Sequence, residues 1–306
     1  MHHYNELTWP ALNALDRKKT VIFIPFSPIE EHGPHLPMGT DLYIAVHMAE
    51  RIAQRIESEH DNIVTVLFPP VPLGAGTVPM LGSVNVSGDL VFEVARQLGS
   101  AFARDGFHHI VFINGHMGGW HMLALENAAR AISRRYHVNA IAPTASLARE
   151  LIWRGQLATS LQGKMTELQM KEFVSGLHSG MLETSVMLAT HNGLVHQAYA
   201  TLPRISGSAM LRWRGRKPTK WQGYVGNPAE AAAEWGEIAL EQFAIAGTQL
   251  ILRLVAEDKQ APRAARIFPR VPYSLAIRKW RALGIAAATG ALLAWTITQL
   301  LQQKRT

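Results

Sequence analysis

A short segment after the first apolar run carries an unusual set of ionisable side chains. The sequence SPIEEHGPHLPMGTDL, residues 27–42, includes Glu30, Glu31, His32 and Asp41. Its prolines restrict the backbone and its glycines permit tight turns, so we expect an ordered loop. Ordering several ionisable groups is costly unless they have partners, and a divalent cation is a suitable partner. A solvated polar loop is the alternative interpretation.

A histidine in a second segment is expected to join these groups. The sequence INGHMGGW, residues 113–120, contains His116 and, like the first segment, follows an apolar run typical of a buried strand. In open parallel sheets, ligands bind beyond the carboxyl ends of the strands. If both runs belong to one parallel sheet, Glu30, His32, Asp41 and His116 meet at one edge of it.

A third segment carries two further ionisable residues. In GLHSGMLETSVML, residues 176–188, His178 precedes an expected helix and Glu183 falls in its first turns. Ser179 could cap this helix. An ordinary loop histidine and a carboxylate stabilised by the helix dipole would explain the same pattern. The segment alone therefore leaves its role open.

The rest of the chain alternates between short apolar runs and longer amphipathic stretches. Buried strands are predicted at residues 21–26, 62–68, 109–114 and 139–144. Helices are predicted at residues 41–58, 88–104, 119–135, 146–174, 183–191 and 227–257. Strands and helices that alternate at this spacing predict an α/β fold, in which helices cover both faces of a parallel sheet.

Composition narrows both the chemistry and the partners. The 306 residues include no cysteine, which excludes disulfides and thiolate metal sites. Any metal must therefore be bound by His, Asp and Glu, a mixed nitrogen and oxygen set that suits Zn, Mn or Fe. Nine of the 30 basic residues follow residue 258, where there is no acidic residue, so residues 1–258 hold 21 basic and 23 acidic side chains. Because the positive charge is confined to the tail, no nucleic-acid partner is expected.

The basic tail also contains an apolar segment. The sequence ALGIAAATGALLAWTITQLL, residues 282–301, has no charged residue, and at about 1.5 Å per residue a helix of that length spans roughly 30 Å. We expect a transmembrane or membrane-associated helix, which a basic linker at 259–281 joins to a body at 1–258. A terminal helix packed on the body or in an oligomer interface is the alternative. Since the N-terminus lacks a signal-peptide apolar region, the body is expected in the cytoplasm, anchored to the inner face of the membrane.

Three of the sequences above, EEHGPHLPMGTD, NGHMGG and HSGMLETS, resemble in this order motifs of the creatininase (creatinine amidohydrolase) family. The resemblance covers roughly residues 15–250 and includes GYVGNPAEAAAEWGE before the last predicted helix. It implies a three-layer creatininase-like fold and a metal-dependent amidohydrolase with two divalent metal ions, often a homohexamer. The implied reaction cleaves a C–N amide bond of a small cyclic amide, a formamide or a peptide-like substrate through a metal-activated hydroxide.

The resemblance also implies which residues bind the two metal ions. The ligands of the first metal correspond to Glu30, Asp41 and His116. A ligand of the second metal corresponds to His32, and the carboxylate that bridges the two metals corresponds to Asp41. Carboxylate and imidazole ligands of this kind are consistent with the donor set that composition allows.

The third motif contributes His178 and Glu183, which we expect to act in catalysis. Proton transfer is expected of His178, and binding of the second metal, or a place beside it, of Glu183. Gly118 stands where creatininase itself has a Glu ligand of the second metal, and Met181 stands where the third motif commonly has Glu. These losses argue against creatinine as the substrate. They also keep open a one-metal enzyme, or a membrane-tethered binding or scaffold protein with a degenerate site.

Three residues are predicted to contact a small-molecule amide. Ser83 lies in GAGTVPMLGSVNV, residues 74–86, which contains Gly-x-Gly after a strand. Pro79 and the lack of an immediate helix argue against a dinucleotide site, so we interpret this segment as a loop at the rim of the substrate pocket. Trp120 and Trp153 could form walls of that pocket, although tryptophan is more often a packing residue.

Overall fold

The apolar runs pair as a parallel sheet in the computed structural model, which describes residues 1–176, 178–205 and 222–256. The strands are β1 (His2–His3), β2 (Thr20–Ser27), β3 (Val64–Leu67), β4 (Val71–Pro72), β5 (His109–Ile113) and β6 (Asn139–Ile141). Their order is β1-β3-β2-β5-β6, and β4 pairs with the end of β2. All these pairs are parallel. Every residue of the central strand β2 is buried, as expected for a strand covered on both faces.

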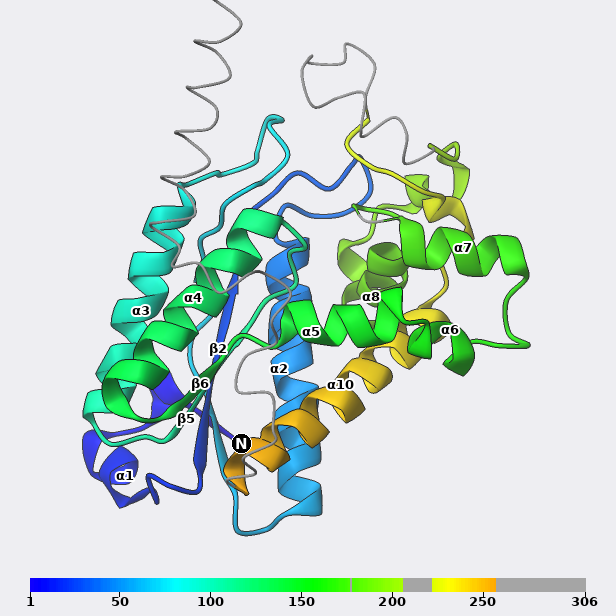
Figure 1. Cartoon of the computed structure of the whole chain (residues 1–306). Helices are drawn as coiled ribbons and strands as arrows, with labels where there is room; N and C mark the ends of the chain where they lie inside the picture. Colours follow the sequence, from blue (N-terminus) through cyan, green and yellow to red (C-terminus); the bar gives the residue numbers. More distant parts are fainter. Residues whose placement is uncertain (177, 206–221, 257–306) are drawn as a thin grey trace, which may run out of the picture. The chain divides into compact units, whose positions relative to one another are not determined.

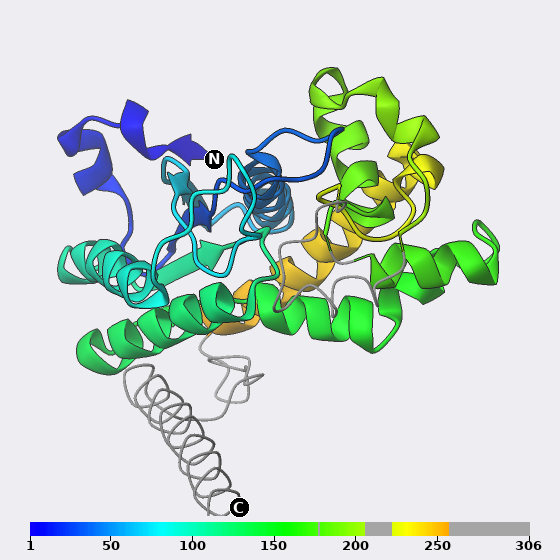
Figure 2. The ribbon, with the colours of Figure 1, turned by 90° about the horizontal axis from the view of Figure 1, so that it is seen from above.

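Helices cover both faces of this sheet. The long helices are α2 (Thr40–Glu59), α3 (Gly88–Arg104), α4 (Gly119–Tyr136) and α10 (Ala233–Val255). The shorter elements are η1 (Tyr4–Glu6), α1 (Trp9–Ala14), α5 (Thr144–Ala148), η2 (Arg149–Trp153), α6 (Gln156–Ser160), α7 (Glu167–Ser175), α8 (Met181–His191), η3 (Asn192–Leu194), η4 (Gln197–Thr201) and η5 (Pro228–Glu230). In Figures 1 and 2, α3 and α4 lie together on one side of the sheet, and α2 and α10 lie on the other. The predicted parallel-sheet α/β fold is confirmed.

Local signals account for the helices whose ends were predicted well. Helix α3 begins after Ser87, whose side chain accepts a hydrogen bond from the backbone N–H of Leu90. Shortly after the helix, Gly106 adopts a left-handed φ of 89°, which glycine tolerates without steric cost. Such capping signals lie within a few residues of the helix they bound, so they can be read from the sequence.

Two predicted helices were wrong as continuous elements. The segment 146–174 is divided among several short helical pieces, because Gly155 has a left-handed φ of 80° and a turn separates α6 from α7. The segment 227–257 begins with the 3₁₀ turn η5, and α10 starts only at residue 233. The strand predicted at 139–144 is also shorter, since Thr144 already belongs to α5.

The apolar helix α10 packs against α2 and α8 and thereby positions α8. A Cβ atom placed on Gly236 of α10 would lie closer than 3.0 Å to the backbone of Ser185 in α8, so glycine permits this close crossing. Among the described residues, α10 is the helix long and apolar enough to span a membrane, but 39% of its most apolar window is buried within the protein. The predicted linker and the predicted helix at 282–301 lie outside the described residues.

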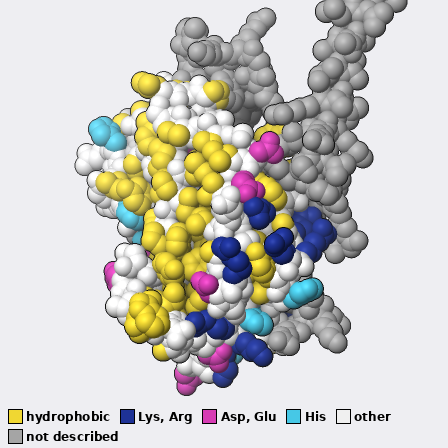
Figure 3. Space-filling view, turned by 90° about the vertical axis from the view of Figure 1, so that its left-hand side faces the viewer, with side chains coloured by type: hydrophobic (Ala, Val, Ile, Leu, Met, Phe, Trp, Pro, Cys, Tyr) yellow, Lys and Arg dark blue, Asp and Glu magenta, His cyan; other side chains and the backbone are white. Residues whose placement is uncertain are grey.

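One side of the molecule exposes many apolar side chains. Figure 3 shows hydrophobic side chains gathered over the side that carries α1 and α3, with Lys and Arg along one margin. Trp9 of α1 is 78% exposed, and Leu90 of α3 is 45% exposed. Contiguous exposed apolar surface commonly marks an interaction site.

Candidate metal centre

Ionisable side chains from four parts of the chain gather beyond the carboxyl ends of the strands. Glu30 and His32 lie in the loop that follows β2, and His116 lies in the loop that follows β5. Asp41 is in the first turn of α2, and Glu183 is in the first turn of α8. The parallel pairing of β2 with β5 places the two loops side by side.

Asp41 lies between two groups of side chains that could each bind a metal ion. In the first group, His116 Nδ1 lies 2.9 Å from Glu30 Oε2 and 3.0 Å from Asp41 Oδ2. In the second, His32 Nε2 lies 3.2 Å from Asp41 Oδ1 and 3.8 Å from Glu183 Oε2. Within each group, the three donor atoms lie within 4.8 Å of one another. The two oxygens of one carboxylate therefore face two groups, as a bridging ligand requires.

The donor atoms of these groups are buried and incompletely satisfied. His32 and Asp41 are at most 1% exposed. Among the described residues, three of the donor atoms have charged neighbours but no hydrogen-bond partner: Glu30 Oε2, His32 Nε2 and Asp41 Oδ2. Buried polar atoms normally have partners, so converging donor atoms without one are suited to binding a cation. The side chains present therefore fit a site for divalent metal ions.

Protons would compete with metal ions for these histidines. Burial alone would lower the pKa of His32, but the carboxylates of Asp41 and Glu183 outweigh it and raise the pKa to about 10. Burial would also lower the pKa of His116, but Asp41 and Glu30 outweigh this effect and raise the pKa to about 10. Burial would raise the pKa of Asp41, yet His32 and His116 hold it well below its ordinary value. Because a metal ion binds the neutral form of histidine, metal binding by His32 and His116 would release protons.

Glu183 is held by the backbone that precedes its own helix. The N–H of Ser179 donates to Glu183 Oε2 at 2.6 Å, and Ser179 adopts an unusual left-handed φ of 51°. The expected side-chain cap by Ser179 was wrong, because Gly180 is the N-cap and no side chain caps α8. Burial and the neighbouring Asp41 raise the pKa of Glu183 to about 7, although His32 opposes the rise. Uncommon backbone of this kind often accompanies a functional site.

His178 stands beside the second group of donors. Its Nε2 donates to the backbone carbonyl of Glu31 at 2.9 Å, which leaves Nδ1 as the basic nitrogen. Its ring lies against that of His32, with centroids 4.6 Å apart. Burial and His32 lower the pKa of His178 to about 3, so the ring is neutral. One donor atom each of His178, Glu30 and His32 also lie within 4.8 Å of one another, so these three residues form a further group that could hold a metal ion.

Comparison with known families agrees with this geometry. A family model described as creatinine amidohydrolase (Creatininase) matches residues 5–251. The chain belongs to the creatininase family. A solved structure described as creatininase Mn shares the fold: its TM-score is 0.59 at 21% sequence identity, over 81% of this chain and 96% of that one.

Relatives with similar sequences are named for different reactions. A mycofactocin precursor peptide peptidase of Mycobacterium ulcerans is 29% identical over 129 residues, which cover 41% of this chain and 46% of the relative. The chain thus matches less than half the length of that relative. A 3-dehydro-scyllo-inosose hydrolase of Thermotoga maritima is 23% identical over 241 residues, 76% of this chain and 72% of the relative. Membership of the creatininase family therefore leaves the substrate open.

The two departures from the creatininase pattern have different structural settings. A Cβ atom on Gly118 would overlap His116 Nε2, so the His116 ring occupies the space that a side chain at position 118 would need. Met181 is fully buried in the hydrophobic core at the start of α8. The orientation of His116 and the glycine at 118 thus depend on each other.

The three predicted substrate residues are less clearly tied to the metal centre. Ser83 Oγ accepts a hydrogen bond from the backbone N–H of Glu31 at 3.0 Å, so it supports the loop that carries Glu30 and His32. Trp120 is 47% exposed at the start of α4. The side chain of Trp153 lies outside the described part of the chain. Substrate contact by these three residues stays a prediction.

Two residues to which the sequence assigned no role support the candidate metal centre. Glu31 links Ser83 to His178 through its backbone, and its own carboxylate accepts from the N–H of Gly33 at 2.7 Å. His121 of α4 is fully buried; its Nε2 donates to a carbonyl of β2, and its ring meets that of His116 edge-on, with centroids 5.6 Å apart. The sequence signal for His121 was a histidine five residues after His116. Glu31 acts largely through backbone hydrogen bonds, which have no sequence signature.

Proposed function

We propose that this chain is a metal-dependent amidohydrolase that cleaves a C–N amide bond of a small cyclic amide, a formamide or a peptide-like substrate. The observation that carries the proposal is the position of Asp41, whose two oxygens face two separate groups of buried ligands. Membership of the creatininase family supports it. The names of two relatives, a mycofactocin precursor peptide peptidase and a 3-dehydro-scyllo-inosose hydrolase, support hydrolysis more strongly than any one substrate.

Two divalent metal ions would be held by overlapping sets of side chains. The first set is Glu30, Asp41 and His116, and the second is His32, Asp41 and Glu183. Zn, Mn and Fe all suit these oxygen and imidazole donors, and a solved creatininase is described with Mn. When bound, such ions lower the pKa of a water molecule and polarise the amide carbonyl.

His178 is the residue we assign to proton transfer. The departing amide nitrogen must gain a proton, and a neutral histidine can accept one and pass it on. Its Nε2 is committed to the carbonyl of Glu31, so the exchange takes place at Nδ1.

Metal content tests the proposal directly. The purified full-length chain should contain about two transition-metal ions per chain after supply of Zn, Mn or Fe, measured by elemental analysis. Asp41→Asn should lose both metals and all amide hydrolysis, because it removes the carboxylate common to both groups. Asp61→Asn, at an exposed position far along the chain from these ligands, is the matched control and should retain both metals.

The possible results distinguish a two-metal enzyme, a one-metal enzyme and a protein without catalysis. An Asp41→Asn variant that keeps both metals and its activity would contradict the bridging role. One metal in the unmodified chain would indicate a mononuclear enzyme. If the chain binds no metal whichever ion is supplied, the rival proposal is favoured: a membrane-tethered binding or scaffold protein with a degenerate site. The absence of a carboxylate at Gly118 and Met181 supports that rival.

We further propose that the protein is a homo-oligomer, a hexamer by family resemblance, with its body in the cytoplasm and its tail at the inner face of the membrane. The exposed apolar side chains over α1 and α3 support association between copies. The uncharged segment 282–301 and the basic residues around it support the anchor.

A further inference from the structure

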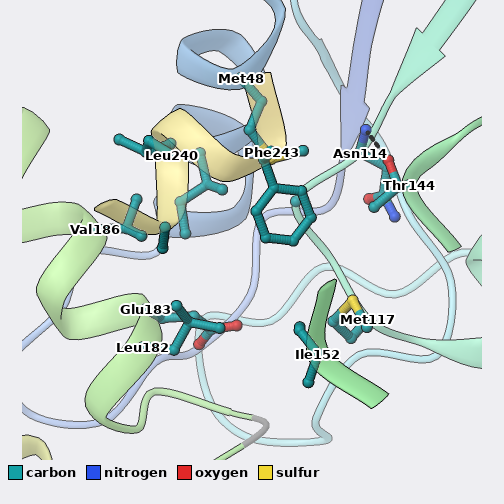
Figure 4. A pocket seen from close by; sticks show the side chains of 13 residues that line it. Met48, Asn114, Met117, Thr144, Ile152, Leu182, Glu183, Val186, Leu240 and Phe243 are labelled. Carbon is teal, nitrogen blue, oxygen red and sulfur yellow. Dashed lines mark hydrogen bonds between the residues drawn. The ribbon is translucent and has the colours of Figure 1, made fainter. Parts of the chain in front are cut away.

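An apolar pocket lies directly beside the candidate metal centre. Its volume is about 60 Å³. Figure 4 shows its wall: Met48 of α2 and Leu240 and Phe243 of α10 come from one side, Leu182, Glu183 and Val186 of α8 from a second, and Met117 and Ile152 from a third. Glu183 is the residue that the pocket shares with the metal centre.

The pocket shares Glu183 with the candidate metal centre and is lined by chain neighbours of two other proposed ligands. Glu183 belongs to the second group of ligands, and Gly115 and Met117, which also line the pocket, flank His116 of the first. Ile44, one turn after Asp41 in α2, lines it as well. A group that occupies the pocket therefore lies next to Glu183, one of the proposed metal ligands.

The lining favours a hydrocarbon group over water. Among the lining side chains, the polar groups apart from Glu183 are those of Asn114 and Thr144. Thr144 Oγ1 accepts from the backbone N–H of Asn114, and the Asn114 side chain is bonded to Ser27 and to the backbone of His116. A buried water needs two to four polar partners, and the side chains of Asn114 and Thr144 already have partners within the protein. Covering this apolar surface with a hydrocarbon group removes it from water, which favours binding.

We propose that this pocket receives a short aliphatic group of the amide substrate, next to the bond that is cleaved. The inference rests on the proposed function and adds a specificity to it. An apolar cavity of about 150 Å³ accepts benzene, so a pocket of about 60 Å³ suits a chain of two to four carbons and not an aromatic ring. The preferred substrate thus carries a small alkyl side chain or acyl group, in contrast to a purely polar amide.

Alkyl hydroxamates of increasing length test this inference, because a hydroxamate binds metal ions through two oxygens. The metal-loaded full-length chain should bind butyrohydroxamate about fifteenfold more tightly than acetohydroxamate by calorimetry, since each buried methylene is worth about a factor of four. Benzohydroxamate should gain no such advantage.

A pair of variants at one position locates the effect. Val186→Ile narrows the pocket, so the ratio of butyrohydroxamate to acetohydroxamate affinity should fall to near one. Val186→Ala widens it and should improve benzohydroxamate binding. Val64→Ile makes the same change on β3, away from the pocket, and should preserve the ratio. Thermal unfolding checks that each variant is folded.

The outcomes distinguish this inference from the proposed function. Equal affinity for all hydroxamates, with metal bound, would overturn the pocket assignment and leave the metal-dependent hydrolase standing. A chain-length preference that Val186→Ile leaves unchanged would also overturn it, because the alkyl group would then lie elsewhere. Failure to take up metal would overturn the proposed function and this inference with it.

Discussion

At the scale of single residues, the candidate metal centre is shaped by the close approach of the Gly118 backbone to the ring of His116. The ring of His116 is enclosed by Glu30 and Asp41 at Nδ1, by the edge of His121, and by the backbone of Gly118 at Nε2. The nearest atoms to a Cβ on Gly118 belong to this ring, whereas a Cβ on Gly119 would meet nothing within 4 Å. Two adjacent glycines therefore differ sharply in what they allow.

This difference predicts opposite effects of one substitution at neighbouring positions. Gly118→Ala should displace the His116 ring and weaken metal binding at least tenfold, as loss of a residue that orients a ligand typically does. Gly119→Ala should leave metal affinity unchanged, because the added methyl group enters open space. Metal titration followed by calorimetry measures both. Equal affinities of the two variants would show that His116 is free to move.

At the scale of secondary-structure elements, α4 buries a carboxylate away from the metal centre. Glu126 is 2% exposed, its Oε1 has no hydrogen-bond partner among the described residues, and its Oε2 lies 3.3 Å from Arg130. Burial raises the pKa of Glu126 to about 7, although Arg130 and Arg149 oppose the rise. The helix therefore carries a group that prefers to be neutral when folded.

The raised pKa of Glu126 predicts a pH-dependent stability. Below pH 4.5, its ordinary value, Glu126 is protonated in both states, and its favourable contribution is fully present. As the pH rises toward 7, the unfolded state ionises first, so that contribution is lost. Glu126→Gln does not titrate, and its stability relative to the unmodified chain should rise between pH 4.5 and 8 by on the order of 3 kcal/mol.

Urea unfolding of both chains across this pH range measures the difference. A stability difference that does not change with pH would contradict the burial of the Glu126 carboxyl group. Because Glu126 lies outside the metal centre, the metal content of both chains should stay equal and serves as the control.

At the scale of the whole molecule, charge and hydrophobicity are divided unequally along the chain. Residues 1–258 hold slightly more acidic than basic side chains, whereas the remaining residues hold nine basic side chains and no acidic ones. The apolar helix α10 packs on α2 and α8, so its composition is explained by the core. The segment 282–301 lies outside the described residues, and its membrane association stays a prediction from its composition.

Removal of residues 279–306 should therefore move the protein from the membrane fraction to the soluble fraction after cell lysis and centrifugation. We expect apolar residues of spanning length to retain the full chain in the bilayer, and the truncated chain lacks them. The metal content of the truncated chain, equal to that of the full chain, would show that the body is intact. A full chain that is soluble without detergent would contradict the anchor.

Much of the architecture followed from local sequence patterns. The predicted helices 41–58, 88–104 and 119–135 agree with α2, α3 and α4 to within one residue at each end. The strand at 109–114 likewise agrees with β5. Periodicity, caps and short apolar runs act over a few residues, so a single sequence carries them. The break at Gly155 was missed because helical composition continues on both sides of it.

By itself, the sequence determined which side chains could bind a metal and that Glu30, His32, Asp41 and His116 would share one sheet edge, since parallel strands present their carboxyl ends together. Only the tertiary structure decided how they divide into two groups around Asp41, how the Glu31 carbonyl holds His178, and how α2, α8 and α10 enclose an apolar pocket. These features join residues more than a hundred positions apart. Such contacts depend on the packing angles of whole helices, which no local pattern encodes.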